Sequence, residues 1–456
     1  MMNASERRAT LALGSIFALR MLGLFMIVPV FAIYGQGYHS ATPALIGIAI
    51  GVYGLTQAIF QIPMSLLADR FPRKPLIVLG LVIFALGGLV SALSSDIWGV
   101  ILGRAIAGAG AVSAVVMALL ADVTREEQRT KAMAAMGMSI ALSFIVAFSL
   151  GPILTQFVGL NGLFALTSVS ALLAIGLLSI VPTPVRALKQ TPTAYREQLK
   201  HVLKVPDLNR LHLSIFMLHL LMTAAFVMIP SQLIELAGIP VERHGWVYLP
   251  LLLLGFVLAI PAIIIAEAKK QMRRIFISAV FLISLSLWLL SSATYFQGSL
   301  LLGIGLFFIA FNLLEALLPS WLAKTAPVAA KATAMGVNAS SQFLGAFVGG
   351  VVGGQLLTHT SAGTAWMVLA IASVCWVMVV LGLSSPPYLS SLAIRLPADD
   401  QLSAQEWAVR LLDIHGIEDA VVLDEHQVAY LKIDKQQFDA DSRQELSSLI
   451  GAPVAF

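Results

Sequence analysis

Long apolar runs follow one another along most of the chain, separated by short polar segments. A helix needs about 20 mostly apolar residues to cross the hydrocarbon core of a bilayer, and twelve runs reach that length. They fall approximately at 11–35, 44–68, 75–95, 97–121, 131–157, 162–182, 208–233, 246–266, 275–293, 298–322, 332–357 and 363–384. The pattern predicts an all-α membrane protein of twelve spans. The first run is too long for a cleaved signal peptide and is expected to remain as a helix.

A different pattern begins at about residue 388, where short alternating segments indicate β-strands and capping residues indicate helices. The strands are expected at 392–397, 421–423, 428–433 and 453–456. The helix starts and stops are Ser403 with Glu406, Ser442 with Glu445, and Gly416 and Gly451. The order βαββαβ is typical of ferredoxin-like folds. We therefore expect residues 388–456 to form a small soluble α+β domain.

Composition agrees with a membrane protein. Charged residues make up 11% of the chain and hydrophobic residues 58%, whereas a soluble domain is about a quarter charged. The single cysteine, Cys375, excludes a disulfide framework and a cysteine-based metal site. The sequence has no P-loop and no HExxH motif. We therefore expect no enzyme, no cofactor and no metal centre.

The basic residues predict the orientation. Lys and Arg gather in loops on one side of the expected membrane, and the other side has only Arg243. Because basic loops stay in the cytoplasm, both termini and the linker 183–207 are expected there. This distribution explains the basic excess better than a nucleic-acid partner does. The linker divides the membrane body into bundles at 1–182 and 208–385.

The two bundles look related. Residues 135–151 and 334–350 carry the same residue at seven of seventeen aligned positions, among them Phe144 with Phe343 and Gly151 with Gly350. This fits a repeat of six plus six spans. Repeated halves place a substrate path at their interface, near the middle of the bilayer.

The loop after the second span, 65–74, resembles the signature GxLaDRxGRK of the major facilitator superfamily, with Ser65 and Pro72 in place of its glycines. The matching charged residues are Asp69, Arg70, Arg73 and Lys74. The alternative is an ordinary basic loop. The resemblance implies the major facilitator fold, with twelve helices in two six-helix halves that work by alternating access.

The same resemblance implies a conformational switch at this loop. In the family's fold the second span borders the eleventh, so Asp69 can face the positive N-terminus of that helix. We expect Asp69 to hold the outward-open state. Arg70 and Arg73 are expected to pair with Asp122, with Arg129 nearby.

Two further motifs resemble the drug:proton antiporter branch of the family. The fourth span carries Arg104 in an RxxxGxGxa pattern, which implies a role in proton coupling. The alternative is an arginine that reaches to the outer face. Gly151 and Pro152 match part of the antiporter motif in the fifth span, where proline bends a helix. The alternative is a packing kink.

Glu315 is the only carboxylate well inside a predicted span, and it lies on the tenth. An acid in a membrane interior can carry a proton, so Glu315 is the expected coupling residue, with Arg104 and Arg20. The alternative is a structural partner for Arg20 or for a helix end, with Asp69 or Asp122 as the coupling acid instead. The expected cavity residues are Tyr34, Tyr53, Gln57, Gln61, His219, Asn312, Asn338 and Gln342. Their alternative role is hydrogen bonding between helices.

These features together predict a proton-coupled exporter of small amphipathic or drug-like molecules, working by alternating access. The expected partners are a small-molecule substrate, protons and the lipid bilayer. The resemblance places the chain as a monomer in a bacterial inner membrane. Two alternatives stay open: an importer or facilitator of a small solute, and a non-transporting sensor that signals through the C-terminal domain.

Overall fold

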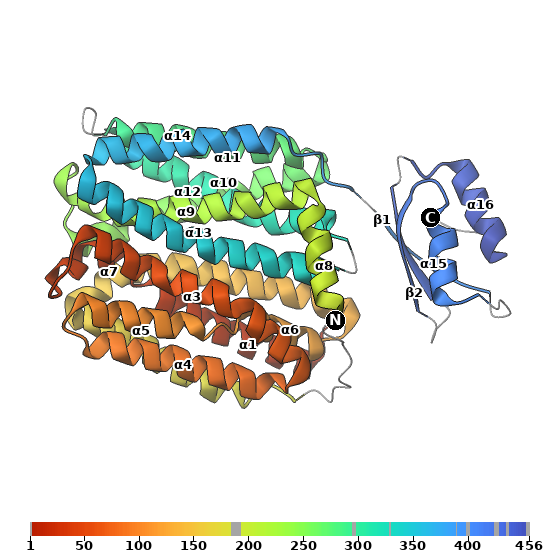
Figure 1. Cartoon of the computed structure of the whole chain (residues 1–456), viewed down its shortest axis with the longest axis horizontal. Helices are drawn as coiled ribbons and strands as arrows, with labels where there is room; N and C mark the ends of the chain where they lie inside the picture. Colours follow the sequence, from red (N-terminus) through yellow and green to blue (C-terminus); the bar gives the residue numbers. More distant parts are fainter. Residues whose placement is uncertain are drawn as a thin grey trace.

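The computed structural model describes residues 2–183, 193–293, 298–327, 330–388, 390–397, 402–423, 428–434 and 437–452. Long helices lie side by side in one bundle, and a small α+β unit lies beyond one end of it (Figure 1). The first helix, α1, begins at this same end, and a short helix, α8, lies across it. We call this end of the bundle the terminal end and the other end the far end.

The first half of the bundle runs from α1 to α7. The elements are α1 Ala4–Phe25, α2 Val28–Tyr34, η1 Gly35–Gly37, α3 Pro43–Arg70, α4 Arg73–Leu93, α5 Ile97–Ala109, α6 Ser113–Asp122 and α7 Glu126–Leu178. The predicted spans 11–35 and 97–121 are each divided into two helices. Pro29 lies in the first turn of α2, where its missing N–H costs no hydrogen bond. α5 ends at Gly110, which leaves the helical conformation at φ −73° and ψ 49°.

The predicted spans 131–157 and 162–182 form one element, α7, which is 53 residues long. Its one residue with non-helical backbone angles is Gly159, at φ 67° and ψ 179°. No atom lies within 4 Å of a Cβ added there, so glycine is required for its backbone angles and not for space. The helix continues through Pro152, and the reversal of direction comes at Gly159.

The second half runs from α8 to α14. The elements are α8 Thr193–Lys204, α9 Pro206–Glu235, α10 Val241–Ala268, α11 Met272–Ser291, α12 Gly298–Thr325, α13 Lys331–His359 and α14 Ala362–Leu381. The predicted linker 183–207 thus contains a helix. Val202 of α8 is fully buried, and Thr333 at the start of α13 donates to Gln198 of α8 over 2.8 Å.

Among the described residues, ten segments are long and apolar enough to cross a membrane. One of them, Lys131–Leu178, has 48 residues and contains the reversal at Gly159, so it accounts for two crossings. Helix α13 is less apolar and is not among the ten, yet its 29 residues pack between α3 and α9 inside the bundle. With α13 added and α7 divided, the twelve predicted spans are all present.

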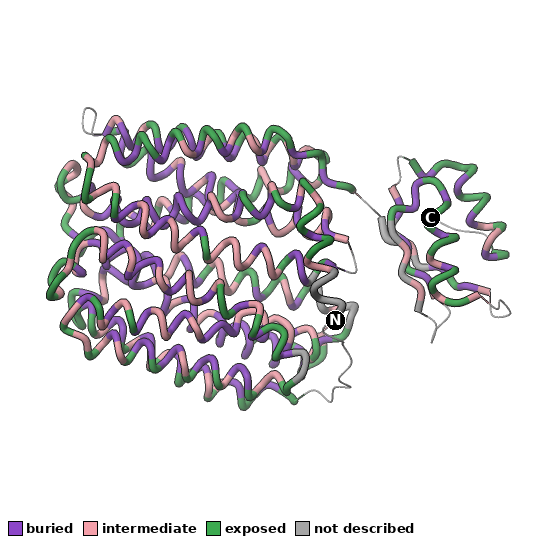
Figure 2. Tube along the Cα trace, viewed as in Figure 1, coloured by how far each residue is buried: buried purple, intermediate pink, exposed green. Residues whose placement is uncertain are grey.

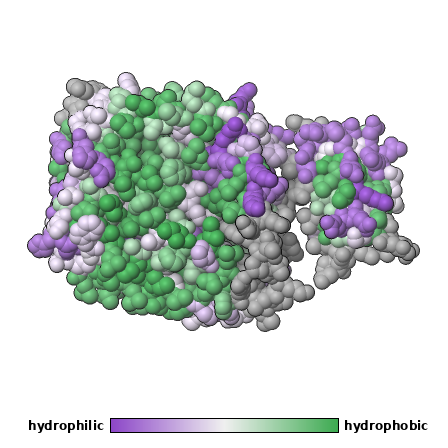
Figure 3. Space-filling model, in the orientation of Figure 1, coloured by the Kyte–Doolittle hydropathy of each residue, from purple (hydrophilic) through white to green (hydrophobic). Residues whose placement is uncertain are grey.

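The surface fits a bilayer. Figure 3 shows hydrophobic residues over the middle of the bundle and hydrophilic residues toward both ends. Exposed residues line the outer edges of the bundle, and buried residues lie between the helices (Figure 2). Large apolar side chains such as Leu79, Val257 and Met378 are about half exposed or more, as expected for contact with lipid chains.

Helices α3 and α13 bring the two halves into backbone contact toward the far end. A Cβ added at Gly51 would lie 2.6 Å from the carbonyl oxygen of Phe347, and one at Gly54 would lie 2.4 Å from that of Phe343. Gly350 in turn approaches the carbonyl oxygen of Gly47. Small residues allow such close approach of helices in membranes. The halves are therefore closed against each other at the far end.

The C-terminal unit contains β1 Ser390–Arg395, α15 Ala404–Leu412, β2 Ile417–Leu423, β3 Val428–Ile433 and α16 Ala440–Ile450. Its strands form an antiparallel sheet in the order β1-β3-β2. A core that includes Trp407, Leu431 and Leu446 lies between the sheet and the helices. The predicted fourth strand, 453–456, lies outside the described residues, so the ferredoxin-like fold stays a prediction.

The helix caps of this unit test the sequence analysis directly. Ser403 and Glu406 form the predicted capping box, and Gly451 ends α16 at φ 68°. The second predicted box is wrong. α16 is capped by Asp439, which accepts bonds from the backbone N–H and the hydroxyl of Ser442. An aspartate at this position satisfies two donors at once, and Ser442 is already inside the helix.

Candidate transport site and gate

Three side chains from three helices meet in the second half of the bundle. The Gln342 amide nitrogen lies 3.3 Å from Oε1 of Glu315 and 2.8 Å from Nε2 of His219. The His219 ring lies 3.7 Å from Oε2 of Glu315, and its Nδ1 is 3.2 Å from the Ile215 carbonyl oxygen. The Glu315 side chain is 38% exposed, whereas that of His219 is 8% exposed. An acid with one accessible face and two polar partners can exchange a proton or a cation.

A group of aromatic rings, the aromatic layer, lies next to this acid. Its members are Phe25 of α1, Phe144 and Phe148 of α7, Phe226 of α9, and Phe307, Phe308 and Phe311 of α12. The layer joins both halves, because α1 and α7 belong to the first and α9 and α12 to the second. It packs the centre of the interface between Glu315 and the far end.

The first half buries Arg20, which is 2% exposed. Its guanidinium donates to the hydroxyls of Ser113 and Tyr53 and to the side-chain carbonyl of Gln57, over 2.6 to 2.7 Å. Gln57 in turn donates to Gln61. The alternative that pairs Arg20 with Glu315 is wrong, because the two side chains bind different partners in different halves.

Arg104 is 5% exposed and donates to the backbone carbonyls of Ala49 and Ile50 in α3. Its guanidinium lies 5.8 Å from the ring centre of Tyr53, whose hydroxyl accepts a hydrogen bond from Arg20. The alternative in which Arg104 reaches the outer face is therefore wrong. The glycines of the motif pack closely: a Cβ at Gly108 would lie 2.3 Å from the Tyr53 carbonyl oxygen.

At the start of α4, directly after the loop that follows α3, Arg73 Nε lies 2.6 Å from Asp122 Oδ2. Lys74 donates to the Val181 carbonyl at the end of the same half. The side chains of Asp69, Arg70 and Arg129 lie outside the described part of the structure. The switch predicted for this loop thus has its Arg73–Asp122 contact in place, while the Asp69 contact stays a prediction.

The remaining residues predicted to line the cavity lie in three separate places. Asn338 lies beside His212 on the face between α13 and α9. Asn312 approaches Gly255 of α10, with its Nδ2 2.9 Å from a Cβ built there. Tyr34 ends α2 at the far end, away from Glu315.

Gly151, of the motif that resembles the antiporter branch, packs closely in α7, because a Cβ there would lie 2.3 Å from the Met26 carbonyl oxygen.

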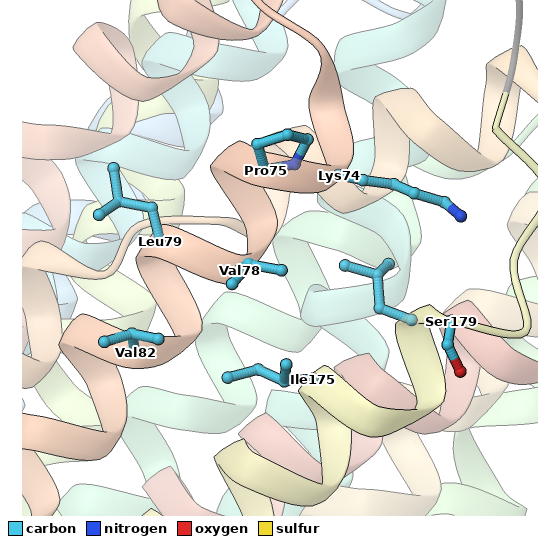
Figure 4. A pocket seen from close by; sticks show the side chains of 8 residues that line it. Lys74, Pro75, Val78, Leu79, Val82, Ile175 and Ser179 are labelled. Carbon is cyan, nitrogen blue, oxygen red and sulfur yellow. The ribbon is translucent and has the colours of Figure 1, made fainter.

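A groove of about 640 Å³ lies elsewhere, between α4 and α7 of the first half (Figure 4). Its lining residues are Lys74, Pro75, Val78, Leu79, Val82, Ile175, Leu178 and Ser179. Both walls belong to one half, and Leu79 is half exposed. The groove therefore opens on the outer surface and is separate from the Glu315 site.

Comparison with known proteins decides the family. The model of the Major Facilitator Superfamily matches residues 13–320. The chain belongs to the major facilitator superfamily. It is 45% identical to the inner membrane transport protein YajR of Escherichia coli K12, over 95% of this chain and 96% of that protein. It is 25% identical to the multidrug resistance protein MdtH of Aeromonas salmonicida, over 78% of this chain and 89% of that protein.

Solved structures support the same fold. The crystal structure of a D-xylose-proton symporter superposes with a TM-score of 0.70 at 16% identity, covering 83% of this chain and 98% of that one. The present chain, a membrane transporter of the superfamily, therefore has the twelve-helix fold of two six-helix halves. It is a multi-pass inner membrane protein, as its relative is.

Sequence reasoning missed two anchors at the terminal end. Glu6, which is 3% exposed, accepts from the backbone and side chain of Arg125 over 2.9 to 3.2 Å, and it completes a capping box with Asn3. The spacing of Asn3 and Glu6 was a signal for the cap. Nothing in the sequence pointed to Arg125, which lies 119 residues away.

The second anchor is Tyr388, at the exit from the membrane body. Its hydroxyl contacts the Ala266 carbonyl and the Met272 N–H over 3.4 and 3.3 Å. The ammonium groups of Lys324 and Lys270 lie 4.8 and 5.7 Å from its ring centre. Partial burial raises the pKa of the Tyr388 hydroxyl above its usual value, so the ring stays neutral at physiological pH. The chain between α14 and β1 is thus fixed to the ends of α10 to α12.

Proposed function

We propose that the protein exports small amphipathic molecules in exchange for protons, with Glu315 as the group that carries the proton. The observation that supports it most strongly is the position of Glu315: it is partly exposed beside His219 and Gln342, one helical turn from Phe311, whose ring stacks on Phe144 of the first half. A carboxylate in a membrane interior is costly unless it is functional or paired. The similarity to a multidrug resistance protein supports export over uptake.

In this proposal the terminal end, with both termini and residues 388–456, faces the cytoplasm. The basic loops support that orientation. The bundles at 1–182 and 208–385 are the two rocking bodies, joined by 183–207. Contact of α3 with α13 closes the far end, which corresponds to an inward-facing state. Deprotonation toward the cytoplasm then leaves Glu315 free to attract a solute.

The gate in this proposal is the charged loop at the terminal end. Arg73 and Asp122 are already paired within the first half, so this part of the network supports the first half as a rigid body. Asp69 closes the cytoplasmic side when it meets the N-terminus of α13. Asp69→Asn is therefore expected to shift the population inward. Unchanged labelling of introduced cytoplasmic-side cysteines in that variant would count against the role of Asp69.

The test uses inside-out vesicles with an acidic lumen, a pH-sensitive dye and a panel of lipophilic cations and neutral amphiphiles. Wild type is compared with Glu315→Gln at equal expression. Proton release from the lumen with wild type alone supports antiport through Glu315. Release with both proteins would move the proton site away from Glu315. Release only when the solute is loaded inside the lumen would indicate uptake by symport instead.

A further inference from the structure

Two rings of the aromatic layer stack across the interface of the halves beside the acid. Phe144 of α7 and Phe311 of α12 have ring centres 5.8 Å apart and planes inclined by 19°. Phe311 lies one helical turn before Glu315, and its ring meets that of His219 edge-on at 5.8 Å. The stack therefore shares its surroundings with the proposed proton site.

Exposure decreases from Glu315 toward the far end. The Glu315 side chain is 38% exposed, Phe144 is 9% and Phe311 is 4% exposed. Behind them, Phe148 and Phe226 form an edge-to-face pair at 4.5 Å and are fully buried. The accessible space around Glu315 thus ends at the Phe144–Phe311 stack, which makes these rings the apolar wall nearest to a solute bound there.

The stack must break during alternating access. Its two rings belong to opposite halves, and the halves separate on this path when the far end opens. Each ring then no longer stacks on the other. Aromatic faces favour offset stacking with other flat rings at centre distances of 4.5 to 7 Å. A flat group on a solute can replace the lost partner on either side, whereas a saturated group cannot offer the same geometry.

We propose that Phe144 and Phe311 bind a flat aromatic group of the transported solute and so select for solutes that carry one. This rests on the proposed transport function and names its substrate class. The neighbouring Glu315 accommodates a positive charge on the same solute. Ring stacking contributes a factor between about two and ten in affinity beyond the burial of area.

The test measures binding to the purified full-length protein. The probes are ethidium, a flat aromatic cation read by fluorescence polarisation, and tetrapentylammonium, a saturated cation read by competition. Phe311→Leu and Phe144→Leu are expected to weaken ethidium binding by roughly two- to tenfold and to leave tetrapentylammonium binding unchanged. Phe311→Tyr keeps the ring and is expected to retain the preference.

The matched control is Phe307→Leu. Phe307 stacks on Phe311 with ring centres 6.2 Å apart and is fully buried, so its loss disturbs packing without removing a wall of the accessible space. The preference for ethidium should survive in this variant. An equal loss for both cations, an equal loss in Phe307→Leu, or no preference in wild type overturns the inference.

Measurements of binding and of proton release together distinguish a failure of this inference from a failure of the proposed transport function. Proton release driven by tetrapentylammonium, together with unchanged ethidium preference in the ring variants, would remove the inference and leave antiport standing. Ring-dependent binding of ethidium with no proton release by any cation would support the site and remove antiport.

Discussion

Among the described residues within the spans, the first half buries two guanidinium groups, those of Arg20 and Arg104, and the second half holds the partly buried carboxylate of Glu315. The described partners of both arginines are hydroxyls, an amide and backbone carbonyls, with no carboxylate among them. Arginine keeps its proton under all physiological conditions, whereas a carboxylate can gain and lose one. The halves thus share a fold but differ in that one holds fixed charges and the other holds the carboxylate proposed to carry the proton, which we call the switchable side.

The largest effect is expected from removing a fixed charge of the first half. Arg20→Met leaves the buried partners in Tyr53, Gln57 and Ser113 without their donor, so we expect the free energy of unfolding to fall by about 3 kcal/mol. Thermal unfolding in detergent measures it. Arg8→Met is the control, because Arg8 is an exposed arginine on the same helix. Equal melting temperatures for Arg20→Met and Arg8→Met would contradict the assignment of Arg20 as a buried structural charge.

The switchable side predicts the opposite result. Glu315→Gln keeps a group that can bond Gln342, so we expect the free energy of unfolding to change by less than about 1 kcal/mol while coupled proton release is lost. Melting and vesicle assays on one preparation measure both. A large loss of stability in Glu315→Gln would make Glu315 a structural residue like Arg20.

A smaller effect is expected at the terminal end. The Arg73–Asp122 pair is partly buried, with side-chain exposures of 9% and 21%. Asp122→Asn removes its charge, and we expect the free energy of unfolding to fall by about 1 kcal/mol, because the pair lies within the first half. Thermal unfolding in detergent measures the loss. An unchanged melting temperature would show that the pair does not stabilise this half.

The smallest effect concerns the C-terminal unit. Bonds from the backbone N–H and hydroxyl of Ser442 lower the pKa of Asp439 below its usual value. A lowered folded-state pKa stabilises the fold above the unfolded pKa of about 4, and this contribution is lost as the pH falls through the lower, folded value. Hydrogen exchange of α16 in the full chain should therefore quicken on acidification. In Asp439→Asn this pH dependence should weaken; an unchanged profile would assign it to other groups.

Removal of residues 389–456 distinguishes transport from signalling. The Glu315 site and both bundles lie before that point, so coupled proton release is expected to persist in the truncated chain. Retention of Tyr388 keeps the anchor on α10 to α12. Complete loss of flux, with normal expression and melting, would favour the reading in which the C-terminal unit is the working part of a sensor.

The sequence predicted the spans and much of the C-terminal unit because each depends on local periodicity and caps. The predicted break between the spans 131–157 and 162–182 contains Gly159, where α7 reverses direction. Asp439 was overlooked as a cap because the Ser442–Glu445 spacing competes with it three residues later. This is an error of position, and it leaves the order of elements correct.

The partners of the buried charges could not be predicted in the same way. Arg20 and Glu315 are isolated charges of opposite sign in their spans, so an ion pair between them was a simple alternative. The structure gives Arg20 three neutral side-chain partners from α3 and α6, and it places the side chains of His219 and Gln342, from α9 and α13, beside Glu315. Such contacts depend on which helix faces face each other, and periodicity within one helix does not contain that information.

The anchor at Tyr388 has a consequence for the local concentration of the C-terminal unit. β1 begins at Ser390, two residues after a side chain that is held on the membrane body. A domain on so short a tether samples only a small volume, so its effective concentration near the ends of α10 and α12 reaches the millimolar range. A contact too weak to be detected between separate molecules would therefore still be occupied for much of the time within this chain.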